Sequence, residues 1–215
     1  LLYEKPLASS GRAVHTNFAK NIFSVTRQVR YNLDNPRQEI DMLIAINGIP
    51  LATLELKNHW TGQNARVHGI RQYQNDRDPN QPLLQFGRCL VHFAVDTEEV
   101  YMTTQLKGKS TFFLPFNQGT SNHGAGNDVN PDGHRTAYLW NEVFTRHNLA
   151  GIVQHFVRFS GKATDALKDR TLFFPRYHQW DVVRKLLAHA GDHGTGQSYL
   201  IQHSAGAGKS NSITW

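Results

Sequence analysis

Residues 40–56 constrain the fold of this chain more than any other part of its sequence. Residues 40–46 are apolar except for Asp41, and such a run predicts a β-strand. An Asn-Gly pair at 47–48 is a turn signal, and residues 52–56 predict the returning strand. The stretch therefore predicts a β-hairpin with mostly apolar strands.

Charged side chains interrupt this hairpin at Asp41, Glu55 and Lys57. A charged side chain within an apolar strand costs free energy, so Asp41 is expected to have a functional role. Glu55 and Lys57 are separated by one residue and leave the same face of a strand. Two carboxylates on neighbouring strands can hold Mg²⁺, which polarises a phosphoryl oxygen and lowers the pKa of bound water. A nearby lysine stabilises the developing phosphate charge, so the three residues predict a metal-dependent phosphodiesterase site. The alternative is an edge hairpin with a surface Glu–Lys pair.

The register of the hairpin decides whether these side chains can meet. An unbulged two-residue turn would put Asp41 and Glu55 on opposite faces of the sheet. A three-residue loop formed by residues 46–48 pairs Asp41 with Thr53 and brings both carboxylates to one face. The site therefore predicts an odd-length loop or a bulge, with Gly48 at positive φ.

These residues resemble a known pattern. Asp41, an apolar spacer and then Glu55-x-Lys57 resemble the signature of the PD-(D/E)xK nuclease superfamily. The longer string EIDMLIAINGIPLATLELKNHWTGQ, continued by IRQYQNDRD, resembles the restriction subunit of type I restriction–modification enzymes, as do FAVDTEEVYMTT and TFFLPFNQG. The resemblance extends over most of residues 24–215. It implies that Asp41 and Glu55 bind Mg²⁺ and that Lys57 assists hydrolysis.

Two positions depart from the pattern. Ile40 stands where the name of the superfamily has proline. Many relatives carry Gln-x-x-x-Tyr on the following helix, and here Tyr73 matches the tyrosine while Gly69 replaces the glutamine. For Tyr73, a DNA contact and simple packing on the sheet are equally supported. Gln72 and Gln74 are the candidates to replace the missing glutamine in positioning DNA.

Residues 203–210, His-Ser-Ala-Gly-Ala-Gly-Lys-Ser, predict a phosphate-binding loop after a strand at 198–202. Glycines let the backbone wrap phosphate, the lysine reaches the outer phosphates and the serine binds Mg²⁺. His203 replaces the usual first glycine, which superfamily 2 helicases often lack. The alternative is a glycine-rich connector. The candidates for ATP binding in this loop are Gly206, Gly208, Lys209 and Ser210.

Gln179 lies about one helix before this loop, in the string FPRYHQ. The string resembles the adenine-recognition element of superfamily 2 motors, in which a glutamine amide pairs with the edge of adenine. A polar residue on a helix face is the alternative. The expected cofactors are therefore Mg²⁺ and, for the full-length motor, ATP.

The remaining pattern predicts an α/β chain with a mixed central sheet flanked by helices, as in restriction endonucleases, followed by the truncated start of a RecA-like domain. The expected units are a nuclease domain at 1–160, a connector at 161–172 and the motor start at 173–215. Further strands are expected at 24–31, 89–95, 100–104 and 111–115, helices at 64–75, 139–157 and 176–190, and a long loop at 119–133.

Composition limits the other possibilities. The chain has 23 Lys+Arg against 17 Asp+Glu, a balance that favours a polyanionic partner such as nucleic acid. Its single cysteine, Cys89, excludes an intrachain disulfide framework and is expected to be a buried hydrophobe. His189 and His193 have zinc-ligand spacing, but Gly191 is expected to interrupt their helix. No signal peptide or long apolar stretch is present, so we expect a cytoplasmic protein without a membrane partner. The chain begins at Leu1, so we expect it to be cut from something longer.

The resemblance implies the Mg²⁺-dependent endonuclease domain of an ATP-dependent type I restriction enzyme, a site-specific deoxyribonuclease acting on double-stranded DNA. The resemblance implies methylation (M) and specificity (S) subunits as partners that supply target recognition. One alternative is a catalytically degenerate DNA-binding module of a superfamily 2 translocase. Another is an ATP-dependent enzyme with no DNA role.

Overall fold

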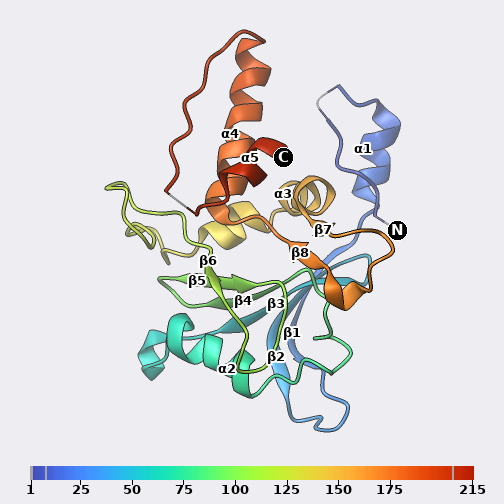
Figure 1. The fold of residues 1–215 in the computed structure, drawn as a ribbon, viewed down its shortest axis with the longest axis vertical. Coiled ribbons are helices and arrows are strands. Elements are labelled where there is room, and N and C mark those ends of the chain that lie inside the picture. Colours follow the sequence, from blue (N-terminus) through green and yellow to red (C-terminus); the bar gives the residue numbers. More distant parts are fainter. Residues whose placement is uncertain (1, 8, 205) are drawn as a thin grey trace.

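A six-stranded sheet forms the centre of the computed structural model, which describes residues 2–7, 9–204 and 206–215 (Figure 1). The strand order follows the sequence, and all neighbours are antiparallel except β3 and β4, which are parallel. This architecture confirms the expected mixed sheet. The strands are β1 (Phe23–Arg30), β2 (Glu39–Ile46), β3 (Ile49–Leu56), β4 (Val91–Val95), β5 (Val100–Thr103) and β6 (Leu114–Pro115).

Helical segments cover both faces of this sheet (Figure 1). On one side a π-helical turn, η2 (Ala65–Gly69), runs directly into α2 (Ile70–Asn75). This confirms the helix expected at 64–75. The other helical segments are α1 (Arg12–Ala19), η1 (His59–Thr61), η3 (Leu139–Val143), α3 (Arg146–Gly151), η4 (Ile152–Phe156), η5 (Leu167–Asp169), α4 (Tyr177–His193) and α5 (Lys209–Thr214).

Two apolar clusters correspond to the two faces. The larger contains Leu54 and Phe93 and packs the sheet against the segments from η3 to α4. The smaller contains Tyr73 and Ala94 and packs the sheet against η2 and α2. Leu54 faces the larger cluster. Because side chains alternate along a strand, the next residue, Glu55, faces the side of the smaller cluster.

The turn between β2 and β3 differs from the expected three-residue loop. Ile46 pairs with Ile49, so the turn contains only Asn47 and Gly48, at φ of 52° and 77°. The three-residue loop was therefore wrong. Two consecutive left-handed residues make a type I′ turn, whose twist matches that of the flanking strands. The expected positive φ at Gly48 is confirmed.

The expected bulge is present, three residues beyond the turn. The pairing moves from Ala45 with Pro50 to Ile44 with Ala52, which leaves Leu51 as the extra residue of β3. Proline has no N–H to donate to the ladder, and within sheets it is confined to edges, strand starts and bulges. A two-residue turn alone would put Asp41 and Glu55 on opposite faces of the sheet. The extra residue of the bulge shifts the register by one and returns them to the same face.

The edge strand β1 contains a strained residue beside this hairpin. Gln28 has a φ of 51°, and the pairing with β2 omits it although Arg27 and Val29 pair with Met42 and Ile40. The left-handed region costs a residue other than glycine about 1–2 kcal/mol. The register sets Gln28 opposite Asp41, so the irregularity lies next to a predicted site residue.

Gln28→Gly is therefore expected to stabilise the protein by up to about 1 kcal/mol, since glycine adopts this φ without strain but adds chain entropy to the unfolded state. Thermal unfolding would measure a rise in Tm of about 2–4 °C. Arg27→Gly is the matched control, because Arg27 has ordinary strand geometry and its replacement should lower Tm. A lower Tm for both variants would contradict the strain at Gln28.

The segment around the glycine loop departs most from expectation. Residues 198–202 form no strand and are exposed, so the strand expected there was wrong. The expected connector at 161–172 joins two short antiparallel strands, β7 (Arg158–Ser160), which lies just before it, and β8 (Thr171–Phe173), which overlaps its end. The helix α4 confirms the one expected at 176–190. Among the described residues after α4 there is no sheet, so no RecA-like domain is seen.

Two minor expectations have clear outcomes. The helix α4 continues through Gly191 to His193, so the expected interruption was wrong. His189 and His193 stack with ring centroids 3.9 Å apart, and no cluster of three or more metal-ligating side chains occurs in the described part of the chain. Cys89 is buried, as expected. No helix in the described ranges has the length and apolarity to cross a bilayer.

Candidate active site

The hairpin brings Asp41 and Glu55 to one face of the sheet. Beyond the bulge Met42 pairs with Leu54, and extending this register by one residue sets Asp41 opposite Glu55. Directly opposite residues of an antiparallel pair project from the same face. Lys57 lies two residues after Glu55 and shares that face. The extended register therefore gives the three residues one face, and a bulge, not an odd-length loop, accounts for it.

Glu55 is completely buried and holds a buried arginine. Its side chain is 0% exposed, and its Oε1 accepts a hydrogen bond from Nε of Arg77 at 2.7 Å. Arg77 is itself buried and donates from Nη2 to the main-chain oxygen of Glu39 at 2.7 Å. The second carboxylate oxygen of Glu55, Oε2, is buried without a hydrogen-bond partner among the described residues. One oxygen of this carboxylate is therefore paired with Arg77, and the other has no hydrogen-bond donor among the described residues.

Burial dominates the electrostatics of Glu55. It raises the pKa of Glu55 from 4.5 to about 7, against the opposing effect of the Arg77 guanidinium. The nearby Asp41 carboxylate raises this pKa further and Lys57 lowers it. A buried carboxylate whose charge is only partly neutralised favours its protonated form. A second cation beside Glu55 would therefore stabilise the ionised carboxylate.

Asp41 and Lys57 are each held in place by a neighbour. Oδ2 of Asp41 accepts a hydrogen bond from the main-chain N of Leu56 at 2.7 Å. Nζ of Lys57 donates to Oε1 of Gln72 on α2. The Lys57 main chain continues the sheet, because its N–H donates to the oxygen of Val95 at 2.8 Å. Strand and helix together therefore fix the ammonium beside Glu55.

The helix candidates for DNA positioning occupy three different environments. Gln72 contacts Lys57, whereas Nε2 of Gln74 donates to the main-chain oxygen of Thr111 at 2.9 Å. Tyr73 is completely buried, with its hydroxyl 2.8 Å from Oγ1 of Thr53. This burial agrees with packing on the sheet. Gln72 is thus the nearer substitute for the missing motif glutamine, and its role toward DNA stays a prediction.

Gly69 has a steric reason to replace that glutamine. A Cβ at residue 69 would lie 2.9 Å from Cβ of Ala94 and 3.6 Å from Cγ of Lys57. Real Cβ atoms essentially never approach each other so closely. The helix therefore packs on β4 too tightly for any side chain at this position.

Arg77 was missed in the analysis of the sequence. It lies just after α2 in the string NDRD, between Asp76 and Asp78, where a local surface charge pair is the ordinary interpretation. Only the packing of the following loop against β2 and β3 brings it to Glu55. The available signal was indirect, because a glutamate buried in a sheet requires a cation from elsewhere in the chain.

The chemistry of the donor set fits a hard divalent cation. Asp41 and Glu55 supply carboxylate oxygens on one face, and Oε2 of Glu55 is a buried acceptor without a donor. Mg²⁺ binds through one or two carboxylates, keeps several waters and accepts substrate phosphate oxygens. The pair of carboxylates is therefore sufficient for a site that water and a phosphodiester complete.

The glycine loop contacts the predicted adenine-recognition residue. Nε2 of Gln179 donates to the main-chain oxygens of Ala207 and Gly208, at 3.2 and 3.1 Å. A Cβ at residue 208 would displace this amide, and the left-handed φ of 77° also favours glycine there. Nζ of Lys209 donates to the oxygen of Ser204 at 3.1 Å. The structure thus brings Gln179 and the loop together, as the sequence suggested.

A cavity of about 690 Å³ lies beside this loop. It is lined by Arg176 and His178 before and within α4, by residues of the loop itself and by Gln118 and Gly119 after β6. Both Gly206 and Gly208 have positive φ, at 72° and 77°, while Ala205 lies outside the described residues. Ser210 is exposed on α5 and the described contacts do not include it in the cavity wall.

Comparison with known proteins agrees with the resemblance in the sequence. Residues 14–111 match a family described as the type I restriction enzyme R protein N terminus. This part of the chain contains β1 to β5, α2 and all the residues placed around Glu55. A protein of Methanocaldococcus jannaschii, named as the endonuclease subunit of the type I restriction enzyme MjaVIIIP, is 22% identical over 214 residues. The match covers 94% of this chain and 18% of the relative.

Proposed function

Because residues 14–111 match the N terminus of type I restriction enzyme R proteins, the chain belongs with these R subunits, and we propose that Asp41, Glu55 and Lys57 form its Mg²⁺-dependent DNA cleavage site. The observation that carries the proposal is the buried Oε2 of Glu55, which has no hydrogen-bond partner among the described residues and lies on the face that Asp41 shares. A surface Glu–Lys pair on an edge hairpin would have neither property. In this proposal the sheet and α2 form a restriction-endonuclease-like core.

The residues of the site have separate tasks. Asp41 and Oε2 of Glu55 hold the metal, while Arg77 fixes the other oxygen of Glu55. When bound, Mg²⁺ supplies polarisation of the scissile phosphate and acidification of a water. Lys57, oriented by Gln72, stabilises the negative charge that develops on the phosphate. Because Gln72 comes from α2, the helix sets the position of the charge.

The rest of the proposal concerns the complete R subunit. The chain spans 18% of the length of the M. jannaschii relative. Gln179, Gly206, Gly208, Lys209 and Ser210 bind ATP at the start of a RecA-like motor domain. The nuclease domain spans residues 1–160, the connector 161–172 and the motor start 173–215. The substrate is double-stranded DNA, the partners are the M and S subunits, and the complex acts in the cytoplasm. Contact between Gln179 and the glycine loop supports the ATP assignment.

The direct test is DNA cleavage by the full-length R subunit in its complex, with Mg²⁺ and with a chelator. We expect cleavage only with the metal. Since the pKa of Glu55 is raised to about 7, metal and proton compete for it, and cleavage at limiting Mg²⁺ should fall about tenfold per pH unit below pH 7. Higher Mg²⁺ should move this midpoint to lower pH.

Single-turnover rates across about pH 5.5 to 8.5, at two Mg²⁺ concentrations, would measure this competition. ATP hydrolysis under the same conditions is the control for pH effects on the motor. Cleavage that persists in the chelator, or a pH profile that ignores the Mg²⁺ concentration, would contradict the proposed site.

A catalytically degenerate DNA-binding module is the second candidate. The complete burial of Glu55 and its pairing with Arg77 favour it, because a purely structural ion pair has the same geometry. Such a module would bind DNA but fail to cut it under any metal condition. The chelator experiment therefore separates the two candidates.

A further inference from the structure

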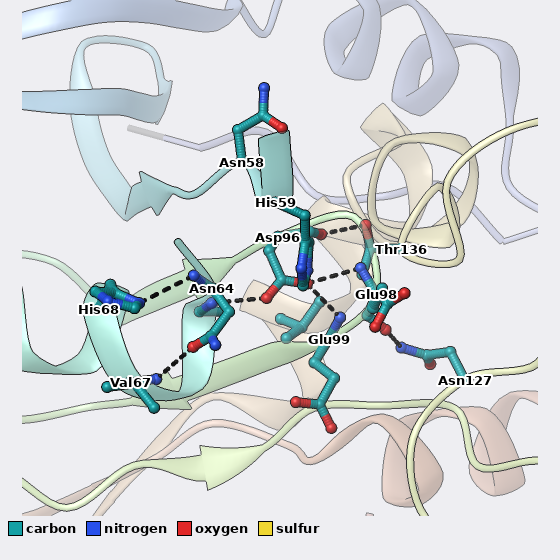
Figure 2. A network of polar contacts seen from close by, with 12 residues as sticks. Asn58, His59, Asn64, Val67, His68, Asp96, Glu98, Glu99, Asn127 and Thr136 are labelled. Atoms are coloured by element: carbon teal, nitrogen blue, oxygen red, sulfur yellow. Dashed lines mark hydrogen bonds and ion pairs between the residues drawn. The ribbon is translucent and has the colours of Figure 1, made fainter. Parts of the chain in front are cut away.

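The segment after the predicted catalytic lysine carries positive charge and no carboxylate. From Leu56 to Asn75 the sequence contains Lys57, Arg66 and Arg71 but neither Asp nor Glu. Both arginines are exposed. The stretch has no carboxylate of its own, although Asp96, Glu98 and Glu99 lie beside it after β4 (Figure 2). Its exposed arginines can therefore contact phosphates directly.

Trp60 stands within this segment and is 94% exposed. It lies on η1, three residues after Lys57, and its indole makes no ring contact with the described residues. Tryptophan is one of the most strongly buried residue types on average and favours binding interfaces. An indole this exposed contributes nothing to the packing of the described fold and is available to a partner.

The backbone on both sides of Trp60 is nevertheless held by hydrogen bonds. Figure 2 shows the contacts around Asp96 that hold the neighbouring residues His59 and Asn64. The buried carboxylate of Asp96 accepts a hydrogen bond from the main-chain N of Ala65 at 2.7 Å and pairs with Nε2 of His59 at 3.3 Å. The side-chain oxygen of Asn58 accepts from the main-chain N of Trp60 at 3.0 Å. Residues on both sides of Trp60 are thus tied to the end of β4.

The end of the loop is fixed in the same way. Gly62 adopts a left-handed φ of 71° and donates to the main-chain oxygen of His59 at 2.9 Å. The side chain of Asn64 caps η2 by accepting from the main-chain N of Val67 at 2.8 Å. A loop fixed in this way loses little conformational entropy when its exposed side chain binds a ligand.

The position of the loop relative to the cleavage site follows from the parallel pair β3–β4. Leu56 pairs with Val95, so the next residues along the two strands, Lys57 and Asp96, leave the same edge of the sheet. Lys57 belongs to the proposed site, and Asp96 anchors the loop that carries Trp60. The exposed indole is therefore presented beside the residue that would face the scissile phosphate.

We propose that residues 58–71 form a DNA-binding surface next to the cleavage site, on which Trp60 packs against a base or sugar of the adjacent nucleotides while Arg66 and Arg71 contact phosphates. The inference rests on the proposed function for the identity of the substrate. Aromatic rings bind nucleotides with little regard to sequence. The combination of an exposed indole with two exposed arginines favours DNA as the occupant, because aromatic rings pack on nucleotides and guanidinium groups bind phosphates.

The test is DNA binding by the full-length R subunit without divalent metal, so that no cleavage occurs. Fluorescence anisotropy with a labelled duplex of about three helical turns would give the affinity. Trp60→Ala is expected to weaken binding about tenfold, and Trp60→Phe to restore most of the loss. Arg66→Ala and Arg71→Ala should each reduce the salt dependence of binding by about one phosphate contact, whereas Trp60→Ala should leave it unchanged.

Phe112→Ala is the matched control, since Phe112 is also a strongly exposed aromatic residue, at 74%. We expect no change in affinity for this variant and no change in Tm for Trp60→Ala. Equal losses for Trp60→Ala and Phe112→Ala, or wild-type affinity of Trp60→Ala, would overturn the proposal. A lower Tm of Trp60→Ala with unchanged DNA binding would also overturn it and would assign the indole to a contact within the R subunit. Because metal is absent, a failure of the cleavage site would leave these results unaffected.

Discussion

Asp41→Ala or Glu55→Ala in the full-length R subunit is expected to reduce DNA cleavage at least about 100-fold while ATP hydrolysis stays near the wild-type rate. Each variant removes one of the two carboxylates proposed to hold Mg²⁺, and no other described carboxylate has a buried, unpaired oxygen. The ATP-binding candidates lie in a different part of the chain, at 179 and 206–210. Cleavage of covalently closed DNA and release of phosphate would measure the two activities separately.

The variants Asp41→Asn and Glu55→Gln test the same charges with little change in volume and should lose cleavage to a similar extent. Glu98→Ala is the matched control, because Glu98 is an exposed carboxylate near the same edge of the sheet. Lys209→Ala is the reciprocal variant, expected to stop ATP hydrolysis and translocation. Normal cleavage by Asp41→Ala or Glu55→Ala would remove the basis of the proposed site.

The hairpin shows which part of the site the sequence could predict. The apolar runs and the Asn-Gly signal located β2 and β3, and the chemistry required Asp41 and Glu55 on one face. The expected bulge is present, but the three-residue loop was wrong. Asn47 and Gly48 together prefer a two-residue turn, and the break in alternation comes from the bulge at Leu51. The proline at 50 was the overlooked signal, because it cannot continue the ladder of hydrogen bonds.

Other features required tertiary structure. Residues 198–202 have the composition of a strand, but a strand forms only when another strand pairs with it, and the described chain offers none there. The absence of a side chain at Gly69 follows from the close approach of η2 to β4, which local sequence does not encode. Arg77 reaches Glu55 across 22 residues of chain. Local patterns therefore predicted the elements, whereas contacts between elements determined the environment of Glu55.

Arg77→Met is expected to lower the free energy of unfolding by about 3–5 kcal/mol at neutral pH. Both partners are buried, with Arg77 6% and Glu55 0% exposed, so removing the guanidinium leaves the Glu55 carboxyl without its hydrogen-bond donor and forces it to take up a proton or remain charged without a counterion. Arg77 also donates to the main-chain oxygen of Glu39, which would lose its partner. Arg77→Lys should recover only part of the loss, because an ammonium cannot reproduce the two directed contacts of the planar group. Urea unfolding at fixed pH would measure these differences.

A double variant, Arg77→Met with Glu55→Met, separates the loss of the pair from the exposure of a lone buried charge. Replacing both members of a buried ion pair by apolar residues is often neutral, so the double variant is expected to be more stable than Arg77→Met alone. A double variant that is less stable than Arg77→Met would contradict a free-energy cost of leaving Glu55 buried without Arg77.

The change of folding stability with pH in Arg77→Met is an independent test of the charge on Glu55. Burial raises the pKa of Glu55 in the folded protein to about 7, above the unfolded value of 4.5, and Arg77 opposes this shift. Without Arg77 the folded pKa rises further. A carboxyl with a raised folded pKa binds its proton more tightly in the native state, so stability falls as pH rises through the interval between the two values. The difference in stability between wild type and Arg77→Met should therefore be small near pH 5 and increase toward pH 8, as about one extra proton is retained by the variant. A difference that is the same at both pH values would place the effect of Arg77 in packing and in the contact with Glu39, not in its charge.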